Sequence, residues 1–228
     1  MKGRIELAGK LILVRHGQTE ANVARRLDTA LPGARLTEIG HGQAKTFGAG
    51  LTGALPKALV ASEAVRARQT ASYIEHASGL VVQVREGIHE AQAGELEDRA
   101  DRASHELFAE VFHSWHVGEL GARIPGGESG EDVLERYLPV VESLRGQYLE
   151  KDDSDGDVLV VSHGAAIRLV AAYLTGLDGR FSADTHLDNT QTIELLPTAA
   201  GGWECVRWGT VLPPFRVPAV DVVDDPMG

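Results

Sequence analysis

Short apolar runs alternate along the chain with segments in which apolar residues recur at helical spacing. Four of the runs have the length of buried strands, at residues 11–14, 58–61, 81–84 and 158–161. The run at 158–161 is the richest in β-branched residues, which places it near the centre of the sheet. Two further runs, at 190–196 and 203–208, flank a turn-forming segment and predict an antiparallel hairpin.

Helical patterns lie between these runs. They predict helices near residues 38–51, 65–76, 103–115 and 129–148, and one more after residue 164. Thr37 is expected to cap the first helix, and Ser129 and Asp132 have the spacing of a capping box. Strands that alternate with helices predict an α/β sandwich with a mainly parallel sheet.

The domain organisation follows from the length and from the absence of repeats or linkers. The chain has 228 residues, which suits one domain with a sizeable core, over residues 1–228. Residues 96–125 interrupt the alternation and predict a helical insertion or lid near the crevice. Residues 213–228 are rich in proline and acidic residues and predict a loosely held tail.

Composition excludes several classes of function. A formal net charge of −11 argues against nucleic-acid partners and against attachment to anionic membranes. No segment approaches the ~20 apolar residues of a membrane span, and residues 1–10 lack the apolar core of a signal peptide. Cys205 is the one cysteine, so no internal disulfide forms. These features predict a cytoplasmic protein.

Two of the predicted strands end in the same polar signature, RHG at residues 15–17 and SHG at 162–164. Because the carboxyl ends of parallel strands line one crevice, His16 and His163 are expected at one rim, with Arg15 beside them. A neighbouring arginine lowers the pKa of a histidine and keeps it unprotonated, as attack on phosphorus requires. The paired motifs therefore predict phosphoryl transfer through a histidine nucleophile.

Neighbouring residues supply further phosphate contacts. Thr19 and Asn22 add neutral donors close to the first motif. His163 and Gly164 stand where a helix begins, and a helix N-terminus favours anions. There His163 would bond an equatorial phosphate oxygen and stabilise the transition state. A plain helix-capping histidine is the alternative interpretation.

Two arginines follow the second predicted strand. Arg66 and Arg68 lie near the start of a helix, where the helix dipole disfavours cations, so they indicate a binding use or a salt bridge. Residues two apart do not share a helix face. One arginine is therefore expected to point inward and the other to solvent.

Glu90 is the candidate proton donor and acceptor. A carboxyl group in a partly desolvated pocket can protonate a leaving alkoxide and later activate water. Local sequence alone favours an exposed loop glutamate over this role. His113 and His116 lie three residues apart without obvious further ligands, so no metal site is predicted. Trp115 and Phe108 either line the lid or pack the insertion, and packing is favoured.

Six segments, in this order, resemble the histidine phosphatase superfamily, the group named after cofactor-dependent phosphoglycerate mutase. They are LVRHGQT (13–19) with Asn22, LTEIG (36–40) with QA (43–44), Ser62 with RARQTA (66–71), HE (89–90), GGES (126–129) and VVSHG (160–164). These segments extend over about residues 11–170. The RHG motif alone is modestly specific, whereas the ordered set is highly specific.

The resemblance implies a fold and a set of roles. The fold is a three-layer α/β/α sandwich with helical insertions near the crevice, and no metal or organic cofactor is expected. His16 would be phosphorylated, Glu90 would be the general acid and base, and Arg66 would be the inward arginine. The phosphate and substrate contacts would come from Arg15, Arg66, His163 and Asn22.

Departures from the mutase pattern favour a phosphatase. Residues 97–124 carry few cations, and residues 21–30 lack the tryptophan usual in mutases. The chain is therefore expected to hydrolyse a small phosphorylated metabolite, with a homo-oligomer possible. The alternatives are a phosphoglycerate mutase-type phosphotransferase primed by a bisphosphate, and a catalytically idle protein that binds phosphate ligands.

Overall fold

The computed structural model describes residues 9–51, 56–150 and 156–216, and a six-stranded sheet forms its middle layer. The strands lie in the order β3-β2-β4-β1-β5-β6. Strands β1 to β4 are parallel, whereas β5 and β6 are antiparallel to their neighbours. The bounds are β1 Leu11–Arg15, β2 Ala58–Ser62, β3 Val82–Arg85, β4 Val158–Ser162, β5 Thr192–Pro197 and β6 Trp203–Trp208. The mainly parallel sheet, the inner position of β4 and the hairpin are thereby confirmed.

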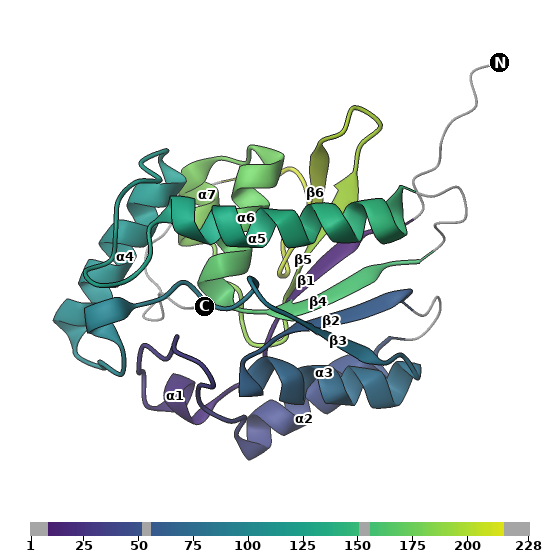
Figure 1. Cartoon of the computed structure of the whole chain (residues 1–228), viewed down its shortest axis with the longest axis horizontal. Coiled ribbons are helices and arrows are strands. Elements are labelled where there is room, and N and C mark those ends of the chain that lie inside the picture. Colours follow the sequence, from purple (N-terminus) through teal and green to yellow (C-terminus); the bar gives the residue numbers. More distant parts are fainter. Residues whose placement is uncertain (1–8, 52–55, 151–155, 217–228) are drawn as a thin grey trace.

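Helices cover both faces of the sheet (Figure 1). Helices α2 (Glu38–Ala49) and α3 (Val65–Ser78) lie on one face, and α5 (Gly130–Leu144) and α6 (Gly164–Thr175) lie on the other. The three-layer prediction is therefore correct. A π-helical turn at Arg145–Leu149 continues α5. None of the helices in the described ranges has the length and hydrophobicity that a bilayer crossing requires.

Each face of the sheet has its own hydrophobic core. Leu13 and Val160 belong to the larger cluster, under α5 and α6, while Val14 and Val161 belong to the smaller one, under α3. Successive strand residues point to opposite faces, so one strand feeds both cores. This burial on both faces is why the strands form continuous apolar runs in the sequence.

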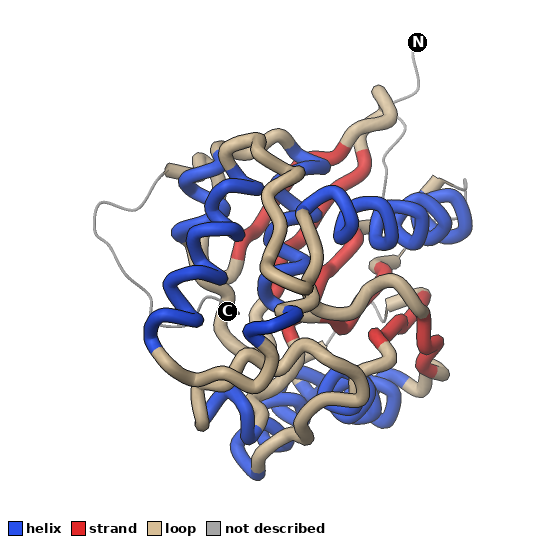
Figure 2. Tube along the Cα trace, turned by 60° about the vertical axis from the view of Figure 1, so that its left-hand side comes forward, coloured by secondary structure: helices blue, strands red, loops and turns tan. Residues whose placement is uncertain are grey.

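The region expected to be a lid is built around α4 (Arg102–His116), which packs on α6 and on the short helix α7 (Gly179–Asp184). Phe108 and Trp115 are buried in the larger core, so their packing interpretation is correct. In Figure 1, α4 stands at the end of the sheet where the parallel strands finish. Figure 2 brings that end forward and shows long loops crossing in front of the strands.

The expected tail begins in ordered structure. Residues 213–216 are described, and the Phe215 ring lies 5.2 Å from that of Phe181. Phe215 therefore packs against the protein, while its described neighbours 213, 214 and 216 are exposed. Residues 217–228 lie outside the described ranges.

Two short helices escaped the sequence patterns. The helices α1 (Glu20–Val23) and α7 have four and six residues, too few to show a helical period. Side-chain caps mark their starts instead, Thr19 for α1 and Asp178 for α7. The short α1 matters because it carries Asn22 to the active site.

Candidate active site

The two histidines of the paired motifs meet at the carboxyl end of the sheet. Strands β1 and β4 are neighbours, and Arg15 is level with Ser162 in their register. His16 and His163 follow directly, so their rings lie 5.3 Å apart in an edge-to-face arrangement. Both side chains are buried. The juxtaposition expected from the sequence is present.

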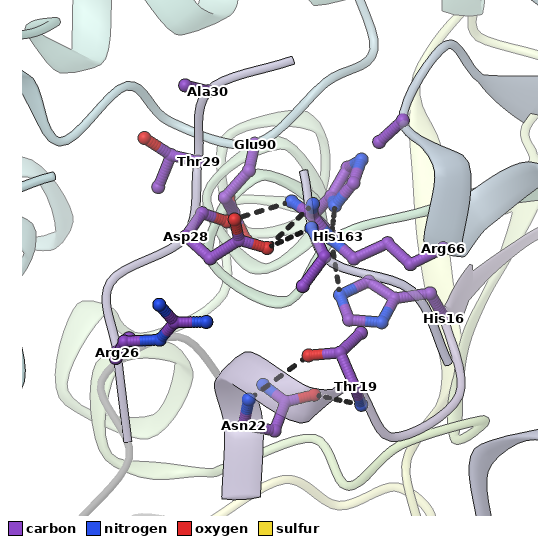
Figure 3. A network of polar contacts seen from close by, with 12 residues as sticks. His16, Thr19, Asn22, Arg26, Asp28, Thr29, Ala30, Arg66, Glu90 and His163 are labelled. Carbon is purple, nitrogen blue, oxygen red and sulfur yellow. Dashed lines mark hydrogen bonds and ion pairs between the residues drawn. The ribbon is translucent and has the colours of Figure 1, made fainter. Parts of the chain in front are cut away.

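Arg66 bridges the two rings (Figure 3). Its Nε lies 3.1 Å from His16 Nε2 and 3.2 Å from His163 Nδ1. Its Nη1 lies 3.2 Å from Asp28 Oδ2, and its Nη2 donates to the Asp28 carbonyl at 3.0 Å. Arg68, two residues further along α3, is exposed. The inward arginine is Arg66, and its unfavourable place near a helix start is offset by the Asp28 carboxylate.

His16 presents an unprotonated nitrogen to the site. Its Nδ1 lies 2.8 Å from the Gly17 carbonyl, so that nitrogen carries the hydrogen. Its Nε2 is then the acceptor that faces Arg66. Burial and the charges of Arg66 and Arg15 lower the pKa of His16 well below its usual value. A neutral imidazole with an available lone pair is the form that a nucleophile requires.

His163 is kept neutral by its contacts with Ser62 and Arg66 and by burial. Its Nε2 lies 2.8 Å from Ser62 Oγ, and its Nδ1 accepts from Arg66. Burial, Arg66 and His16 lower the pKa of His163 well below its usual value. His163 is the N-cap residue of α6 but makes no side-chain cap hydrogen bond. The capping interpretation is therefore wrong.

The carboxylate of Glu90 caps α6 instead. Its Oε1 accepts from the Ala166 amide at 2.9 Å and from the Ala91 amide at 2.8 Å, and its Oε2 accepts from the Ala165 amide at 3.1 Å. Glu90 is buried, so the exposed-loop alternative is wrong. Burial raises the pKa of Glu90, although these amides and Arg66 oppose the shift. Glu90 therefore keeps its proton to higher pH than an exposed glutamate.

These groups surround one pocket, the active-site pocket. It is lined by Arg15, His16, Thr19, Asn22, Arg26, Asp28, Arg66 and Glu90. His163 contacts Arg66 and His16 without lining the pocket, and Gly164, buried at the start of α6, does not line it either. The sequence predicted that the N-terminus of α6 binds phosphate. Its amides at Ala165 and Ala166 instead donate to the Glu90 carboxylate.

Thr19 and Asn22 cap one another at α1. Thr19 Oγ1 accepts from the Asn22 amide at 3.1 Å, and Asn22 Oδ1 accepts from the Thr19 amide at 3.0 Å. This capping box uses the oxygen atoms of both side chains. Among the described residues the hydroxyl hydrogen of Thr19 and the amide hydrogens of Asn22 have no acceptor, so they are left for a ligand in the pocket.

Arg26 and Asp28 are lining residues that the sequence analysis missed. They lie in residues 21–30, a segment that the sequence distinguishes only by its lack of the tryptophan usual in mutases. No periodicity or motif singles them out, because their place in the pocket depends on the loop after α1. The ion pair between Asp28 and Arg66 joins residues 38 positions apart.

Arg136, also missed, holds the loop that carries Glu90. Its Nη1 donates to the carbonyls of Gly87 and His89, at 2.8 and 2.9 Å. Its Nη2 donates to the Glu90 carbonyl at 3.0 Å. Its Nε lies 2.8 Å from the Glu128 carboxylate, and both side chains are mostly buried. Arg136 is therefore a positioning residue for Glu90.

If Glu90 is the proton donor that the sequence predicts, replacing Arg136 by methionine is expected to lower kcat for alkyl phosphates about 100-fold, because it displaces that donor. The unpaired Glu128 should also lower the free energy of unfolding by about 3 kcal/mol. Kinetics with alkyl and aryl esters test this, since a displaced acid harms the poorer leaving group more. Arg123→Met is the control, because Arg123 pairs with Asp132 and does not contact the Glu90 loop. Equal losses for both esters would contradict the positioning role.

Replacing Arg66 by alanine is expected to lower kcat/KM about 100- to 1000-fold, the usual cost of removing a preorganised donor to an anionic transition state. Affinity for inorganic phosphate should fall in parallel, as calorimetry would measure. Arg68→Ala removes the same charge from the same helix and should leave both quantities within about twofold of the parent. Similar losses in the two variants would show that the overall positive charge of α3, rather than the contact of Arg66 with His16, supports catalysis.

The described residues contain no group of three or more His, Cys, Asp or Glu side chains able to hold a metal ion. His113 Nδ1 lies 3.7 Å from Asp184 Oδ1, and His116 Nδ1 lies 2.9 Å from the Phe112 carbonyl. The two histidines therefore have different partners.

Comparison with known proteins gives a consistent picture. The histidine phosphatase superfamily (branch 1) matches residues 11–211. A glucosyl-3-phosphoglycerate phosphatase of Mycobacterium tuberculosis is 30% identical over 207 residues, covering 88% of this chain and 92% of that protein. A probable phosphoglycerate mutase of Erwinia tasmaniensis is 30% identical over 210 residues, covering 89% of this chain and 93% of its own.

A longer relative and a solved structure extend the comparison. A PE-PGRS family protein of M. tuberculosis is 28% identical over 92% of this chain, which spans only 38% of that protein. A mycobacterial glucosyl-3-phosphoglycerate phosphatase solved in complex with VO3 superposes with a TM-score of 0.76 at 28% identity. That superposition covers 90% of this chain and all of the other.

Fold, site and matches together define a phosphatase of the phosphoglycerate mutase-like kind. The chain belongs to the histidine phosphatase superfamily, branch 1.

Proposed function

We propose that this protein is a phosphomonoester hydrolase that acts on a small phosphorylated metabolite through a phosphohistidine at His16. One observation supports it above all. The neutral Nε2 of His16 and the buried carboxyl of Glu90, whose pKa is raised, belong to the same arginine-lined pocket. The proposal keeps the expectations of a cytoplasmic setting and of no metal or organic cofactor.

In the first step, His16 Nε2 attacks phosphorus in line with the ester oxygen. The N–P bond forms as the P–O bond breaks, and Glu90 gives its proton to the departing alcohol. Arg15 and Arg66 donate to the phosphoryl oxygens as charge develops. A bound phosphoryl dianion would favour a protonated His163, which would donate from Nδ1 to a phosphoryl oxygen once the Arg66 Nε–H turns from that nitrogen to the same group.

In the second step, water enters where the alcohol left. The Glu90 carboxylate takes a proton from this water while the water oxygen attacks phosphorus. The N–P bond breaks, and its electron pair returns to His16 Nε2. Inorganic phosphate leaves, and Glu90 is again protonated for the next substrate.

The mutase alternative requires a pocket that retains a bisphosphorylated intermediate, which calls for extra positive charge. Here the Asp28 carboxylate accompanies the three arginines of the pocket. Arg26 is in addition paired with Asp98 at 2.8 Å. This balance supports hydrolysis over transfer between two phosphate positions.

The deciding experiment measures phosphate release from an aryl phosphate and from a panel of phosphorylated metabolites. Hydrolysis without a primer supports the proposal. Conversion of 3-phosphoglycerate to its 2-isomer only when a bisphosphoglycerate primer is added would favour the mutase. Thermal stabilisation by phosphate without any turnover would indicate an idle binding protein.

A further inference from the structure

The part of the active-site pocket formed by Arg26 and Asp28 has no role in the two chemical steps. In Figure 3 these two side chains lie across the pocket from His16. In-line displacement places the leaving alcohol on the side of phosphorus opposite His16. Arg26 and Asp28 are therefore in position to meet the alcohol part of the substrate.

Hydrogen bonds fix the position of the Asp28 carboxylate. Its Oδ2 accepts from the Ala34 amide at 2.9 Å and lies 3.2 Å from Arg66 Nη1. The next two amides of the loop, at Thr29 and Ala30, donate to the Glu97 carboxylate at 2.9 and 3.0 Å. Before Asp28, Leu27 donates to the Arg99 carbonyl and accepts from the Asp98 amide, so the loop is fastened on both sides of Asp28.

Gly33 completes this arrangement. It has a φ of +72°, and a Cβ at this position would lie 2.2 Å from Arg66 Nη1. Only glycine combines this backbone conformation with such a close approach of the guanidinium. The close packing allows Arg66 to reach the Asp28 carboxylate and the two histidines together.

Arg26 and Asp28 offer one donor and one acceptor for a ligand. Arg26 Nη1 pairs with Asp98, but its buried Nε has no hydrogen-bond partner within the described part of the chain. The side-chain contacts of Asp28 found there all use Oδ2, which leaves Oδ1 as an acceptor. A hydroxyl group both donates and accepts, so it complements this pair. A buried N–H without a partner is costly, and a bound hydroxyl would relieve that cost.

The charge of Asp28 adds selectivity. A carboxylate fixed beside the leaving group repels a second negative charge there, whereas a neutral hydroxyl meets no such penalty. Because Asp28 Oδ2 is hydrogen-bonded to the Ala34 amide and to Arg66, a change of its side-chain rotamer to avoid an anionic substrate would break both contacts.

We propose that Arg26 and Asp28 form a hydroxyl-binding subsite for the alcohol part of the substrate. The enzyme accordingly takes phosphate monoesters of neutral polyols and discriminates against phosphorylated carboxylic acids. This inference rests on the proposed phosphatase function and names the substrate class of that same site.

Two probes isolate the relevant charge. Glycerol 3-phosphate and 3-phosphoglycerate differ only at the far carbon, which is a hydroxymethyl group in one and a carboxylate in the other. Calorimetry in a His16→Ala background measures their Kd values without turnover, and inorganic phosphate serves as the reference for the phosphoryl site. Glycerol 3-phosphate is expected to bind about tenfold more tightly than 3-phosphoglycerate.

Adding Asp28→Asn should reduce this preference to about twofold or less, mainly through tighter binding of 3-phosphoglycerate. Glu20→Gln is the matched control, because Glu20 is exposed at the start of α1 and does not line the pocket. It removes the same charge and should leave the preference unchanged. Dividing by the Kd of inorganic phosphate removes any effect that reaches the site through Arg66.

Arg26→Lys is the second variant, in case Asp28→Asn does not fold. It keeps the charge but loses the Nε donor, so glycerol 3-phosphate should bind about fivefold more weakly, with inorganic phosphate unaffected. Tighter binding of 3-phosphoglycerate by the parent, or an unchanged preference in Asp28→Asn, would overturn the inference. Failure of the unmutated enzyme to release phosphate from any monoester would instead refute the proposed function.

Discussion

Alanine at His16 is expected to lower kcat/KM for an aryl phosphate on the order of 10⁵-fold, the scale seen when a covalent nucleophile is removed. The reason is local. The described residues place no second unprotonated nitrogen beside Arg66 except His163 Nδ1, and His163 does not line the pocket. Steady-state kinetics and rapid acid-free quenching with a ³²P-labelled ester measure both the rate and the covalent intermediate.

The unmutated enzyme should carry an acid-labile, base-stable label, and His16→Ala should carry none. His76→Ala is the matched control, because His76 is exposed on α3, outside the pocket. Retention of label in His16→Ala, or a rate within tenfold of the parent, would assign the nucleophile to another residue.

Replacing Glu90 by glutamine should lower kcat/KM for alkyl phosphates about 100- to 10,000-fold, because the amide cannot protonate the leaving alkoxide. An aryl phosphate, whose leaving group departs without a proton, should lose far less. Glutamine keeps the shape and one carbonyl oxygen for the α6 amides, so the cap is partly retained. Kinetics with a series of leaving groups of different acidity check this expectation.

Exposed Glu95, in the same loop, gives the control Glu95→Gln, which should behave as the parent. Equal losses for aryl and alkyl esters would reduce Glu90 to a structural cap of α6. The leaving-group dependence therefore separates the catalytic role from the structural one.

The pH profile should follow from the two opposite shifts. His16 must be unprotonated, and because its pKa is lowered, kcat/KM should fall only when the pH drops through that lowered pKa. Glu90 must be protonated, and because its pKa is raised, kcat/KM for alkyl esters should fall as the pH rises through that raised pKa. Glu90→Gln should lose the alkaline fall with alkyl esters while keeping the acid one.

The sequence by itself determined the elements and the pairing of the two motifs. Strands buried on both faces must be continuous apolar runs, and the fold places the carboxyl ends of parallel strands at one edge. His16 and His163 could thus be brought together from local pattern alone. The spacing of Arg66 and Arg68 showed that only one points inward, and the family resemblance indicated which.

Only the tertiary structure decided which distant polar groups contact one another in the site. Glu90 caps α6, Arg136 braces the Glu90 loop and Asp28 holds Arg66, each across 38 or more positions of sequence. Such contacts join loops whose conformation depends on the packed core beneath them. Periodicity reports which face of an element is buried, but it carries no information about which distant polar group a side chain will meet there.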